Sequence, residues 1–212
     1  MKAVSIKPGR IIVFAKAPKP GFAKTRLIPA LGAQGAAELA QEMLTNTLQA
    51  ALGADIGTVE LCVTPSMGDT AWDEFQPPPG IVISDQGEGD LGARMARAAQ
   101  RGIEQGEAII LIGTDCKEIS AGLLTEASQV LHDHDAIIHC TVDGGYALLG
   151  LNRFSDFLFS NMPWSTDAVA SMTLGRLGQL GWSVHVGRML HDVDEPKDLK
   201  YLPKHWSLHA VA

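Results

Sequence analysis

Residues 10–27, RIIVFAKAPKPGFAKTRL, join an apolar run to a basic, proline-rich stretch, and this junction decides the fold. The run at 10–15 is β-branched and apolar without polar alternation, which is typical of a parallel strand covered on both faces. Residues 16–29 hold three prolines and one glycine, which predict a loop. A second buried strand, EAIILI at 107–112, is followed in the same way by the loop GTDC. The sequence therefore predicts a sheet whose strands end in loops rich in charge and glycine.

Helical and strand patterns alternate along the rest of the chain. Further strands are predicted over 58–63, 81–84, 135–139, 146–151 and 182–186, and helices over 35–52, 91–105, 121–131, 166–180 and 195–202. This alternation favours an α/β fold with a mostly parallel central sheet covered on both faces. No repeat or long linker interrupts it, so we expect one domain over 1–212 with its core at about 10–202. Ligands of such sheets bind where loops leave the carboxyl ends of the strands.

Composition narrows the classes of function. The chain has 212 residues, 46% of them hydrophobic, and 17 Lys and Arg against 24 Asp and Glu give a net charge of −7. Net acidity disfavours a general nucleic-acid binder, which needs basic surface. The first ten residues lack a signal-peptide core, and no apolar stretch approaches the roughly 20 residues of a membrane span. We therefore expect a soluble, cytoplasmic protein with no membrane span.

The cysteines and three of the tryptophans are expected to be structural. Cys62, Cys116 and Cys140 are widely spaced and form no CxxC pair, so each is interpreted as a small buried hydrophobe in a reducing compartment. Trp164, Trp182 and Trp206 could lie in the core or at an interface, and the core is preferred.

Four cations gather in the loop after the first strand, at Lys16, Lys19, Lys24 and Arg26. Such a gathering in an acidic protein indicates an anion site. Arg26 can grip phosphate with two hydrogen bonds, while a lysine acts as a point charge. The bend at Pro20 and Gly21 would turn backbone N–H groups towards phosphate oxygens. The glycine spacing of a Walker A motif is absent, and the alternative is a solvated basic loop.

Carboxylates follow two later strands. Asp115 comes directly after the buried run at 107–112, and Asp192 and Asp194 fall on the same side of an extended segment. Carboxylate oxygens suit Mg²⁺ or Mn²⁺, so these three residues are the candidate metal ligands. The alternatives are that Asp115 caps a turn and that Asp194 caps the helix beginning near Pro196.

Two glycine-containing loops complete the candidate site. Asp143 precedes two glycines that would permit positive φ or close approach to a ligand, although a tight turn into a strand explains them equally well. In QGEGDLGAR, residues 86–94, Asp90 could cap the following helix and Arg94 could face the site or solvent. The candidate nucleotide- and phosphate-binding residues are Lys16, Pro20, Gly21, Lys24, Arg26, Gln86, Asp90, Arg94, Gly144 and Gly145.

These residues, taken in order, resemble the DUF2064 family of bacterial proteins. The resemblance rests on FAKAP at 14–18, KTRL at 24–27, DLG at 90–92, IGTDC at 112–116, DGGY at 143–146 and DVD at 192–194. Members belong to the nucleotide-diphospho-sugar transferase superfamily and are often labelled glycosyltransferases of arsenosugar biosynthesis or rSAM/selenodomain-associated transferases. The resemblance implies a GT-A fold, a Rossmann-like three-layer sandwich. It also implies a nucleotide site on the first loop and a divalent metal near Asp115.

Two stretches depart from the family pattern. Lys117 and Glu118 follow Thr-Asp-Cys where proline is usual, which could change the shape or charge of the metal loop. Residues 140–142, Cys-Thr-Val, stand where a Gly-Pro-Ala-like segment is usual, which could change the acceptor side.

The combined pattern predicts a pocket for a metal-bridged di- or triphosphate. The family resemblance implies a transferase that uses a nucleotide-sugar and a bound Mg²⁺ or Mn²⁺ to act on a small-molecule acceptor. Lys24 and Arg26 would balance phosphate charge during the reaction, and Asp143 would orient the acceptor or act as a base. The KTRL segment is also similar to the loop of phospholactate guanylyltransferases, so nucleotidyl transfer from an NTP to a phosphorylated small molecule stays open.

Two further alternatives are a phosphohydrolase and a non-catalytic nucleotide-binding protein, in which Lys117 would replace the metal. No nucleic-acid partner is expected, and association into a homodimer stays open.

Overall fold

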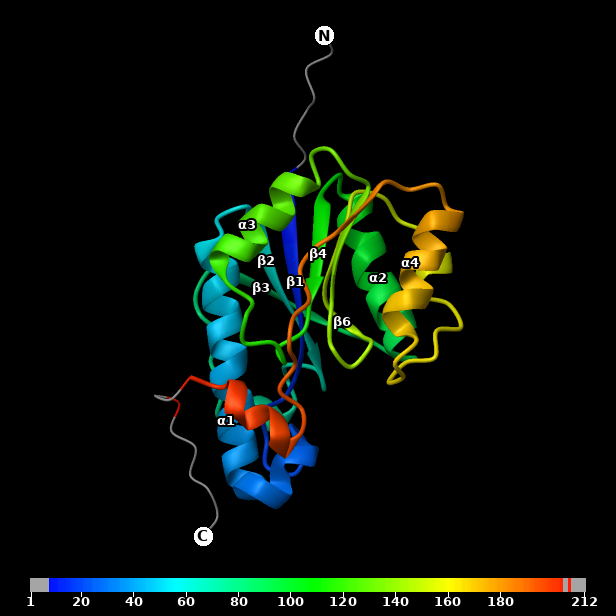
Figure 1. The fold of residues 1–212 in the computed structure, drawn as a ribbon. Helices are drawn as coiled ribbons and strands as arrows, with labels where there is room; N and C mark the ends of the chain where they lie inside the picture. The colour runs from blue at the N-terminus through cyan, green and yellow to red at the C-terminus, as the bar shows by residue number, and fades with distance from the viewer. Residues whose placement is uncertain (1–7, 204–205, 207–212) are drawn as a thin grey trace.

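A single seven-stranded sheet forms the centre of the computed structural model, which describes residues 8–203 and 206 (Figure 1). Its order is β3-β2-β1-β4-β6-β5-β7. The strand β6 runs antiparallel to β4 and β5, and all other neighbours are parallel, which confirms the expected mostly parallel sheet. The strands are β1 (Gly9–Lys16), β2 (Gly57–Thr64), β3 (Ile81–Asp85), β4 (Ala108–Ile112), β5 (Ala136–Cys140), β6 (Tyr146–Leu151) and β7 (Val184–Val186).

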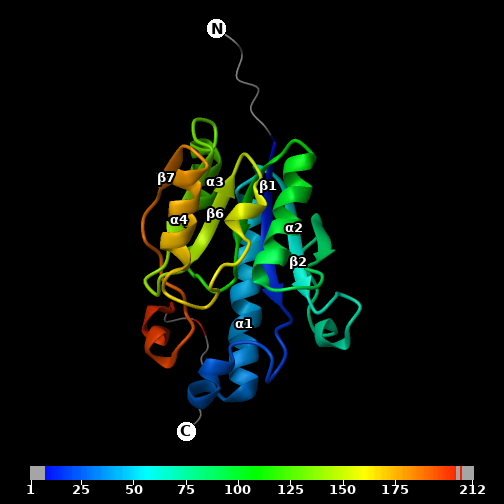
Figure 2. The ribbon, with the colours of Figure 1, turned by 90° about the vertical axis from the view of Figure 1, so that its right-hand side faces the viewer.

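Helices cover both faces of this sheet. Figures 1 and 2 show α1 (Ile28–Gly53) and α3 (Ala121–Val130) on one face, and α2 (Leu91–Glu104) and α4 (Val169–Gln179) on the other. Side chains of β1 divide between two apolar clusters by strand alternation, with Ile11 and Val13 on the α1 side and Ile12 on the α2 side. The observed layers are those expected of the predicted three-layer sandwich.

Two predicted helices differ from the observed ones at their starts. The long helix α1 begins at Ile28 rather than residue 35, and it is two helices joined across a kink at Gly32, whose φ is 70°. The helix α4 begins at Val169 rather than residue 166, because Thr166 turns back to donate a hydrogen bond to the carbonyl of Pro163. Both differences arise from local backbone turns, not from the periodicity of the apolar residues.

The described part of the chain also contains four short 3-10 helices: η1 (Thr25–Leu27), η2 (Thr70–Trp72), η3 (Asp156–Leu158) and η4 (Pro196–Tyr201). The last of them is the predicted final helix, with proline in its first turn. Ser120 caps α3 as expected, since its hydroxyl accepts the N–H of Leu123 at 3.3 Å. No helix within 8–203 combines the length and the apolar character that crossing a membrane requires.

The expected structural residues are largely buried. Cys62 and Cys116 are buried and Cys140 is partly buried, all as free thiols. Trp182 and Trp206 lie in the core as predicted, whereas Trp164 is only partly buried.

A buried ion network joins three strands to α2. Glu60 on β2 is 1% exposed and accepts from Arg10 of β1 at 2.7 Å and from the hydroxyl of Ser84 on β3 at 2.6 Å. Arg101 of α2 also pairs with Glu60, and Glu107 pairs with Arg10 at 2.5 Å. Because Glu60 has partners on every side, it is the centre of the network.

We expect Glu60→Gln to destabilise the fold, because it leaves two arginines around a neutral group in a buried position. Removing one partner of a buried pair costs about 3 kcal/mol. For a domain of this size, that corresponds to a fall in melting temperature of roughly 6–12 °C, measured by calorimetry. Glu74→Gln, at an exposed position, is the matched control and should leave the melting temperature unchanged. A fall no larger than that of the control would contradict the assigned role of Glu60.

Candidate active site

A cavity of about 750 Å³ lies at the carboxyl ends of the parallel strands. Lys16 ends β1, Asp115 follows β4, and Tyr146 begins the antiparallel β6, so all three reach the same edge of the sheet. This is the place where ligands were expected from the strand–loop pattern. Of the predicted site residues, those that line the cavity are Lys16, Lys24, Arg26, Gln86, Asp115, Asp143, Gly145, Asp192 and Asp194.

The other predicted residues lie beside the cavity rather than on its wall. Asp90 is the N-cap of α2, where Oδ1 accepts the N–H of Ala93 at 2.8 Å. Arg94 donates to the carbonyl of Gly89 at 2.9 Å. Pro20 and Gly21 lie at an exposed turn of the first loop, and Gly144 supports the turn described below.

Gln86 has a structural contact that the sequence did not indicate. Its side chain is 5% exposed, and Nε2 donates to the carbonyls of Ala15 at 3.1 Å and Cys62 at 3.0 Å. These bonds tie β1 to β2 just before the first loop leaves the sheet. Gln86 therefore braces the base of that loop as well as lining the cavity.

The ammonium group of Lys24 lies among the predicted metal ligands. Its Nζ pairs with Asp115, lies 3.2 Å from Oδ1 of Asp194 and donates to the carbonyl of Val193 at 2.6 Å. The side chain is only 5% exposed. Burial lowers the pKa of Lys24, but the charges of Asp115 and Asp194 outweigh it, so the net pKa is raised. Lys24 is therefore a fully charged lysine that holds two carboxylates together.

Asp192 lies in the same acidic cluster and is strongly perturbed. Burial, together with the charges of Asp115, Asp143 and Asp194, raises the pKa of Asp192 to about 7, and the charge of Lys24 only partly offsets this. The cluster thus carries more negative charge than its lysine compensates.

The oxygens of this cluster are of the type that a hard divalent cation prefers, since carboxylates and a backbone carbonyl converge on one point. In this conformation the ammonium of Lys24 takes that point. Within 8–203 and 206, no three His, Cys, Asp or Glu residues are arranged so that they could hold a metal ion. A metal at Asp115 and Asp194 therefore requires Lys24 to move away.

The cation beside Asp115 is thus Lys24 and not Lys117, whose side chain is exposed. The neighbouring Glu118 has a defined contact instead. Its Oε2 accepts the backbone N–H of His191 at 2.7 Å and lies 3.1 Å from Nδ1 of the same residue. Glu118 therefore anchors the segment that carries Asp192.

Further contacts hold this C-terminal segment across the sheet edge. Cys116 forms a β-bridge with Asp192, and the N–H of Val193 donates to the carbonyl of Asp115 at 2.9 Å. The expectation that Asp194 caps the last helix is wrong. The N-cap of η4 is Glu195, and Asp198 accepts its N–H at 2.8 Å, so the Asp194 carboxylate is free to face Lys24.

Arg26 and Lys16 are the accessible cations of the first loop. Nη1 of Arg26 is 3.9 Å from Oδ2 of Asp194, and the side chain is 66% exposed. Lys16 is exposed at the end of β1. Both line the cavity, so they can meet an anion there without first breaking a buried ion pair.

Asp143 begins a turn that is fixed against the start of α4. Its Oδ1 accepts the hydroxyl of Thr141 at 2.5 Å and the N–H of Gly145 at 3.1 Å, and among the described residues its Oδ2 has no partner. Gly144 has φ 90°, and a Cβ there would lie 2.2 Å from the carbonyl oxygen of Asp167. The glycine is therefore needed both for its φ and for close packing, as the sequence suggested.

Aromatic and apolar side chains also line the cavity, and this surface was not recognised from the sequence. Trp164 and Tyr146 line the cavity together with the apolar side chains of Leu91 and Met95. The indole packs so closely on α2 that a Cβ at Gly92 would lie 2.9 Å from Nε1 of Trp164. Within the described chain, this Nε1 is a buried donor without a hydrogen-bond partner. Only the fold could show this, since residues 91–95 and 164 come from separate segments.

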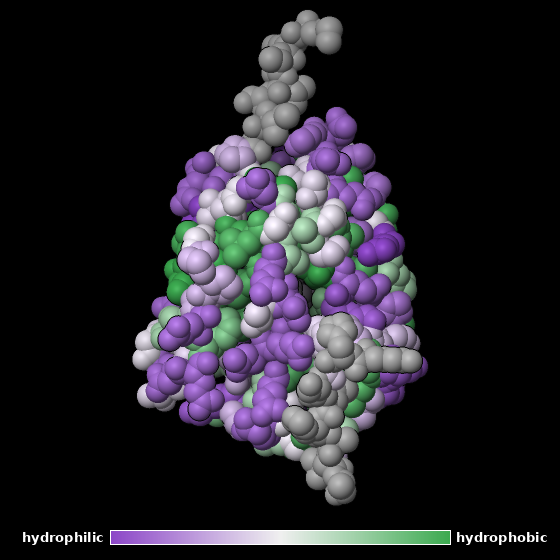
Figure 3. All heavy atoms as spheres, turned by 90° about the vertical axis from the view of Figure 1, so that its left-hand side faces the viewer, coloured by the Kyte–Doolittle hydropathy of each residue, from purple (hydrophilic) through white to green (hydrophobic). Residues whose placement is uncertain are grey.

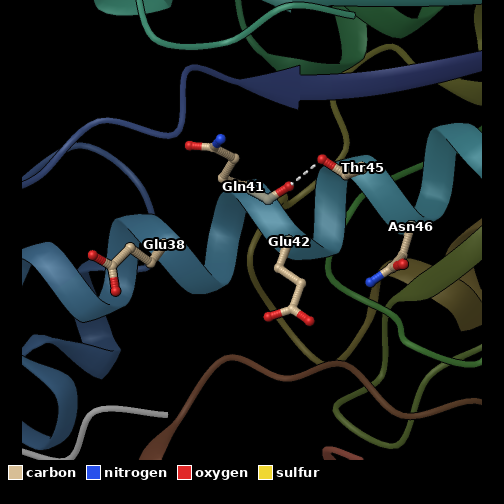
Figure 4. A pocket seen from close by; sticks show the side chains of 5 residues that line it. All are labelled: Glu38, Gln41, Glu42, Thr45 and Asn46. Carbon is tan, nitrogen blue, oxygen red and sulfur yellow. Dashed lines mark hydrogen bonds between the residues drawn. The ribbon is translucent and has the colours of Figure 1, made fainter. Parts of the chain in front are cut away.

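A second hollow, of about 350 Å³, lies on α1 and has none of these features. Figure 4 shows its side chains along one helix, with Glu42 and Asn46 on one side and Gln41 on the other. The face formed by α1 and α3 is largely hydrophilic with apolar patches between (Figure 3). The chemistry of the molecule is therefore concentrated in the large cavity.

Comparison with known proteins supports the fold and the family. The profile of the family described as "Uncharacterized protein conserved in bacteria (DUF2064)" matches residues 47–166. No curated protein matches the sequence. A crystal structure from Desulfovibrio desulfuricans G20, provisionally named a nucleotide-diphospho-sugar transferase, is similar with a TM-score of 0.85 and 28% identity. The similarity covers 93% of this chain and 87% of that one.

More distant structures share the fold alone. Rv0371c from Mycobacterium tuberculosis H37Rv, in complex with manganese, has a TM-score of 0.52 at 17% identity over 93% of this chain and 99% of that one. The 4-diphosphocytidyl-2C-methyl-D-erythritol synthase of Anaerococcus prevotii has a TM-score of 0.58 at 12% identity, over 93% of this chain and 95% of that one. A CMP:2-keto-3-deoxy-manno-octonic acid synthetase in complex with CTP has a TM-score of 0.55 at 12% identity. The similarity covers 91% of this chain and 95% of that one.

We expect Asp192→Asn to stabilise the metal-free protein at high pH. The folded-state pKa of Asp192, about 7, lies above its ordinary value of 3.8, so the carboxyl costs stability progressively as the pH rises from about 4 through 7. At pH 8 in EDTA the substitution should raise the melting temperature by roughly 2–4 °C, or about 1 kcal/mol, because the amide carries no charge.

At pH 5 the gain should largely vanish, since Asp192 is then protonated in the folded protein. Asp133→Asn, on an exposed turn outside the cavity, is the control. An equal gain at both pH values would argue against charge repulsion at Asp192.

Proposed function

Because the chain belongs to the DUF2064 family and has the fold of nucleotide-sugar and cytidylyl transferases, we propose that it is a divalent-metal-dependent transferase using a nucleotide-sugar. One observation carries the proposal. The cavity at the carboxyl ends of the strands is lined on one side by the basic loop and on another by converging aspartates. A metal-bridged diphosphate needs both kinds of group within reach.

The cationic residues of the cavity bind phosphate, and the carboxylates bind the metal. Arg26 and Lys16, both accessible, bind the phosphate oxygens and balance the negative charge that develops on the departing nucleoside diphosphate. Asp115, Asp192 and Asp194 would hold Mg²⁺ or Mn²⁺ after their side chains and Lys24 rearrange, because no three such side chains of the described chain form a metal site in this conformation. The metal, when bound, neutralises phosphate oxygens. Manganese in the related fold of Rv0371c supports a metal of this class.

Lys24 would change its ionic partners when metal and donor bind. In this structure its ammonium neutralises Asp115 and Asp194. Lys24 would leave these carboxylates when they hold a metal and turn towards the phosphates of the donor, which offer it a new anionic partner. Charge balance in the cavity is then kept in both states.

Asp143 acts on the acceptor. Its Oδ1 is held by Thr141 and Gly145, which leaves Oδ2 to accept the hydrogen bond of an acceptor hydroxyl. The hydroxyl oxygen bonds to the sugar carbon as the bond from that carbon to the diphosphate breaks, and the hydroxyl proton passes to Oδ2.

Nucleotidyl transfer is the second candidate function. The fold is also that of cytidylyltransferases, one of them in complex with CTP. The two reactions differ in what leaves, since an NTP would release pyrophosphate and a nucleotide-sugar a nucleoside diphosphate. Product analysis therefore separates them.

Thermal-shift measurements with a panel of NTPs and nucleotide-sugars, with and without Mn²⁺, test the proposal. A nucleotide-sugar should raise the melting temperature most when Mn²⁺ is present. Arg26→Ala should lower turnover with that donor by about 100-fold, consistent with about 2.7 kcal/mol of lost charge stabilisation.

Lys19→Ala, in the same loop but outside the cavity wall, is the matched control. Unchanged turnover in Arg26→Ala would contradict the phosphate role. Metal-independent binding without turnover would indicate a non-catalytic nucleotide-binding protein, and release of free sugar or phosphate without an acceptor would indicate a hydrolase.

We expect metal and nucleotide to bind cooperatively, because Lys24 competes with the metal until a phosphate accepts it. Mn²⁺ affinity, measured from the electron paramagnetic resonance of free Mn²⁺, should be weak in the protein alone and increase with nucleotide. Lys24→Met should raise the affinity without nucleotide by about tenfold, which is 1.4 kcal/mol. Lys16→Met removes a cation that lines the cavity but pairs with no described aspartate, and it should change this affinity little. Equal affinities in the wild type and Lys24→Met would contradict the competition.

A further inference from the structure

Positive charge in the cavity is confined to one loop. Every lysine and arginine among the described lining residues, namely Lys16, Lys24 and Arg26, comes from that loop. The opposite wall, made by residues 143–147 and 164–169, contains no cation among its lining residues, and its charged members are Asp143 and Asp167. The two sides of the cavity therefore differ in the charge of ligand that they can accept.

The cations of the loop are already committed by the proposed function. Lys24 is buried against Asp115 and Asp194, and Lys16 and Arg26 are the groups left for the phosphates of the donor. A second phosphate or carboxylate placed by the opposite wall would meet two carboxylates and no compensating cation. Like charges repel at short range, so this wall selects against a second anion.

The same wall offers neutral contacts in its place. Trp164 and Tyr146 supply flat apolar surface, on which an uncharged ring or chain can pack. Oδ2 of Asp143 is an acceptor without a partner among the described residues, whereas the N–H of Trp164 is buried against Gly92 of α2. Such a combination recognises a hydroxyl-bearing molecule.

The wall is also preformed. Gly144 packs directly against the backbone of Asp167, and the N–H of Ala170 donates to the carbonyl of Gly144 at 2.8 Å. The two segments are thus joined where they meet the cavity. A ligand would find their carboxylates and aromatic surface already in position.

We propose that residues 143–147 and 164–169 form the acceptor subsite, and that it takes an uncharged, hydroxyl-bearing acceptor and excludes phosphorylated or carboxylated ones. The inference rests on the proposed function, because it assigns the basic loop to the donor. It deepens that function by choosing between acceptor classes, and it disfavours a phosphorylated acceptor of the kind that nucleotidyl transfer would use.

Matched pairs of probes that differ by one phosphate test the acceptor class. Glycerol is compared with glycerol 3-phosphate, and glucose with glucose 6-phosphate, in the presence of Mn²⁺ and the donor that most stabilises the protein. Binding is followed by tryptophan fluorescence and transfer by mass spectrometry. In at least one pair, the protein should bind the uncharged member about tenfold more tightly than the phosphorylated one, a difference of 1.4 kcal/mol.

The variant Asp167→Lys supplies a gain of function. Its side chain is exposed on the wall, so the substitution adds a cation without disturbing the core. It should shift preference towards the phosphorylated member of each pair, whereas Asp133→Lys makes the same charge change outside the cavity and should not.

Preference of the wild type for a phosphorylated probe would overturn the proposal, as would an equal response within every pair, including no response. Failure of the proposed function looks different. In that case no nucleotide raises the melting temperature with Mn²⁺, whatever the acceptor probes do.

Discussion

The pairing of Lys24 with Asp115 and Asp194 is the interaction on which the architecture of the site depends. It joins three segments that are distant in sequence: the first loop, the loop after β4 and the C-terminal segment beyond β7. Each segment carries charge that would be unfavourable alone in a half-buried position. By pairing, they can line one cavity while the sheet beneath remains apolar. Burial and the remaining excess of negative charge together raise the pKa of Asp192.

The sheet makes this convergence possible. Parallel strands β1 and β4 are neighbours, so the loops that follow them leave the same edge side by side. The antiparallel β6 begins at that edge, which brings the turn at Asp143 to the cavity from the opposite chain direction. The C-terminal segment then crosses the edge, held by the bridge from Cys116 to Asp192 and by Glu118 at His191. As a result, the lining of the cavity has a cationic part on the first loop, and a part at residues 143–147 and 164–169 whose only charges are carboxylates.

Much of the fold and many of the site residues could be predicted, because each depends on local pattern. The run at 107–112 is apolar at every position but the first, and it became the fully buried β4. Asp115 follows a strand of the parallel sheet, so its place at the sheet edge follows from strand direction. Asp143 reaches the same edge because β6 runs antiparallel, which the pattern of residues did not show. The kink at Gly32 and the late start of α4 were missed, because they depend on backbone turns whose signal is weaker than helical periodicity.

The sequence by itself determined the class of fold, the basic character of the loop at 16–26 and the acidity of 115 and 192–194, because strand periodicity and side-chain charge are properties of short segments. Only the tertiary structure decided which charges meet. It placed Lys24 rather than Lys117 beside Asp115, gave the cap of η4 to Glu195 rather than Asp194, and brought Trp164 to the same cavity as the basic loop. Partners of this kind come from distant segments. Their pairing is settled by the competition between burial and charge neutralisation, which no local pattern encodes.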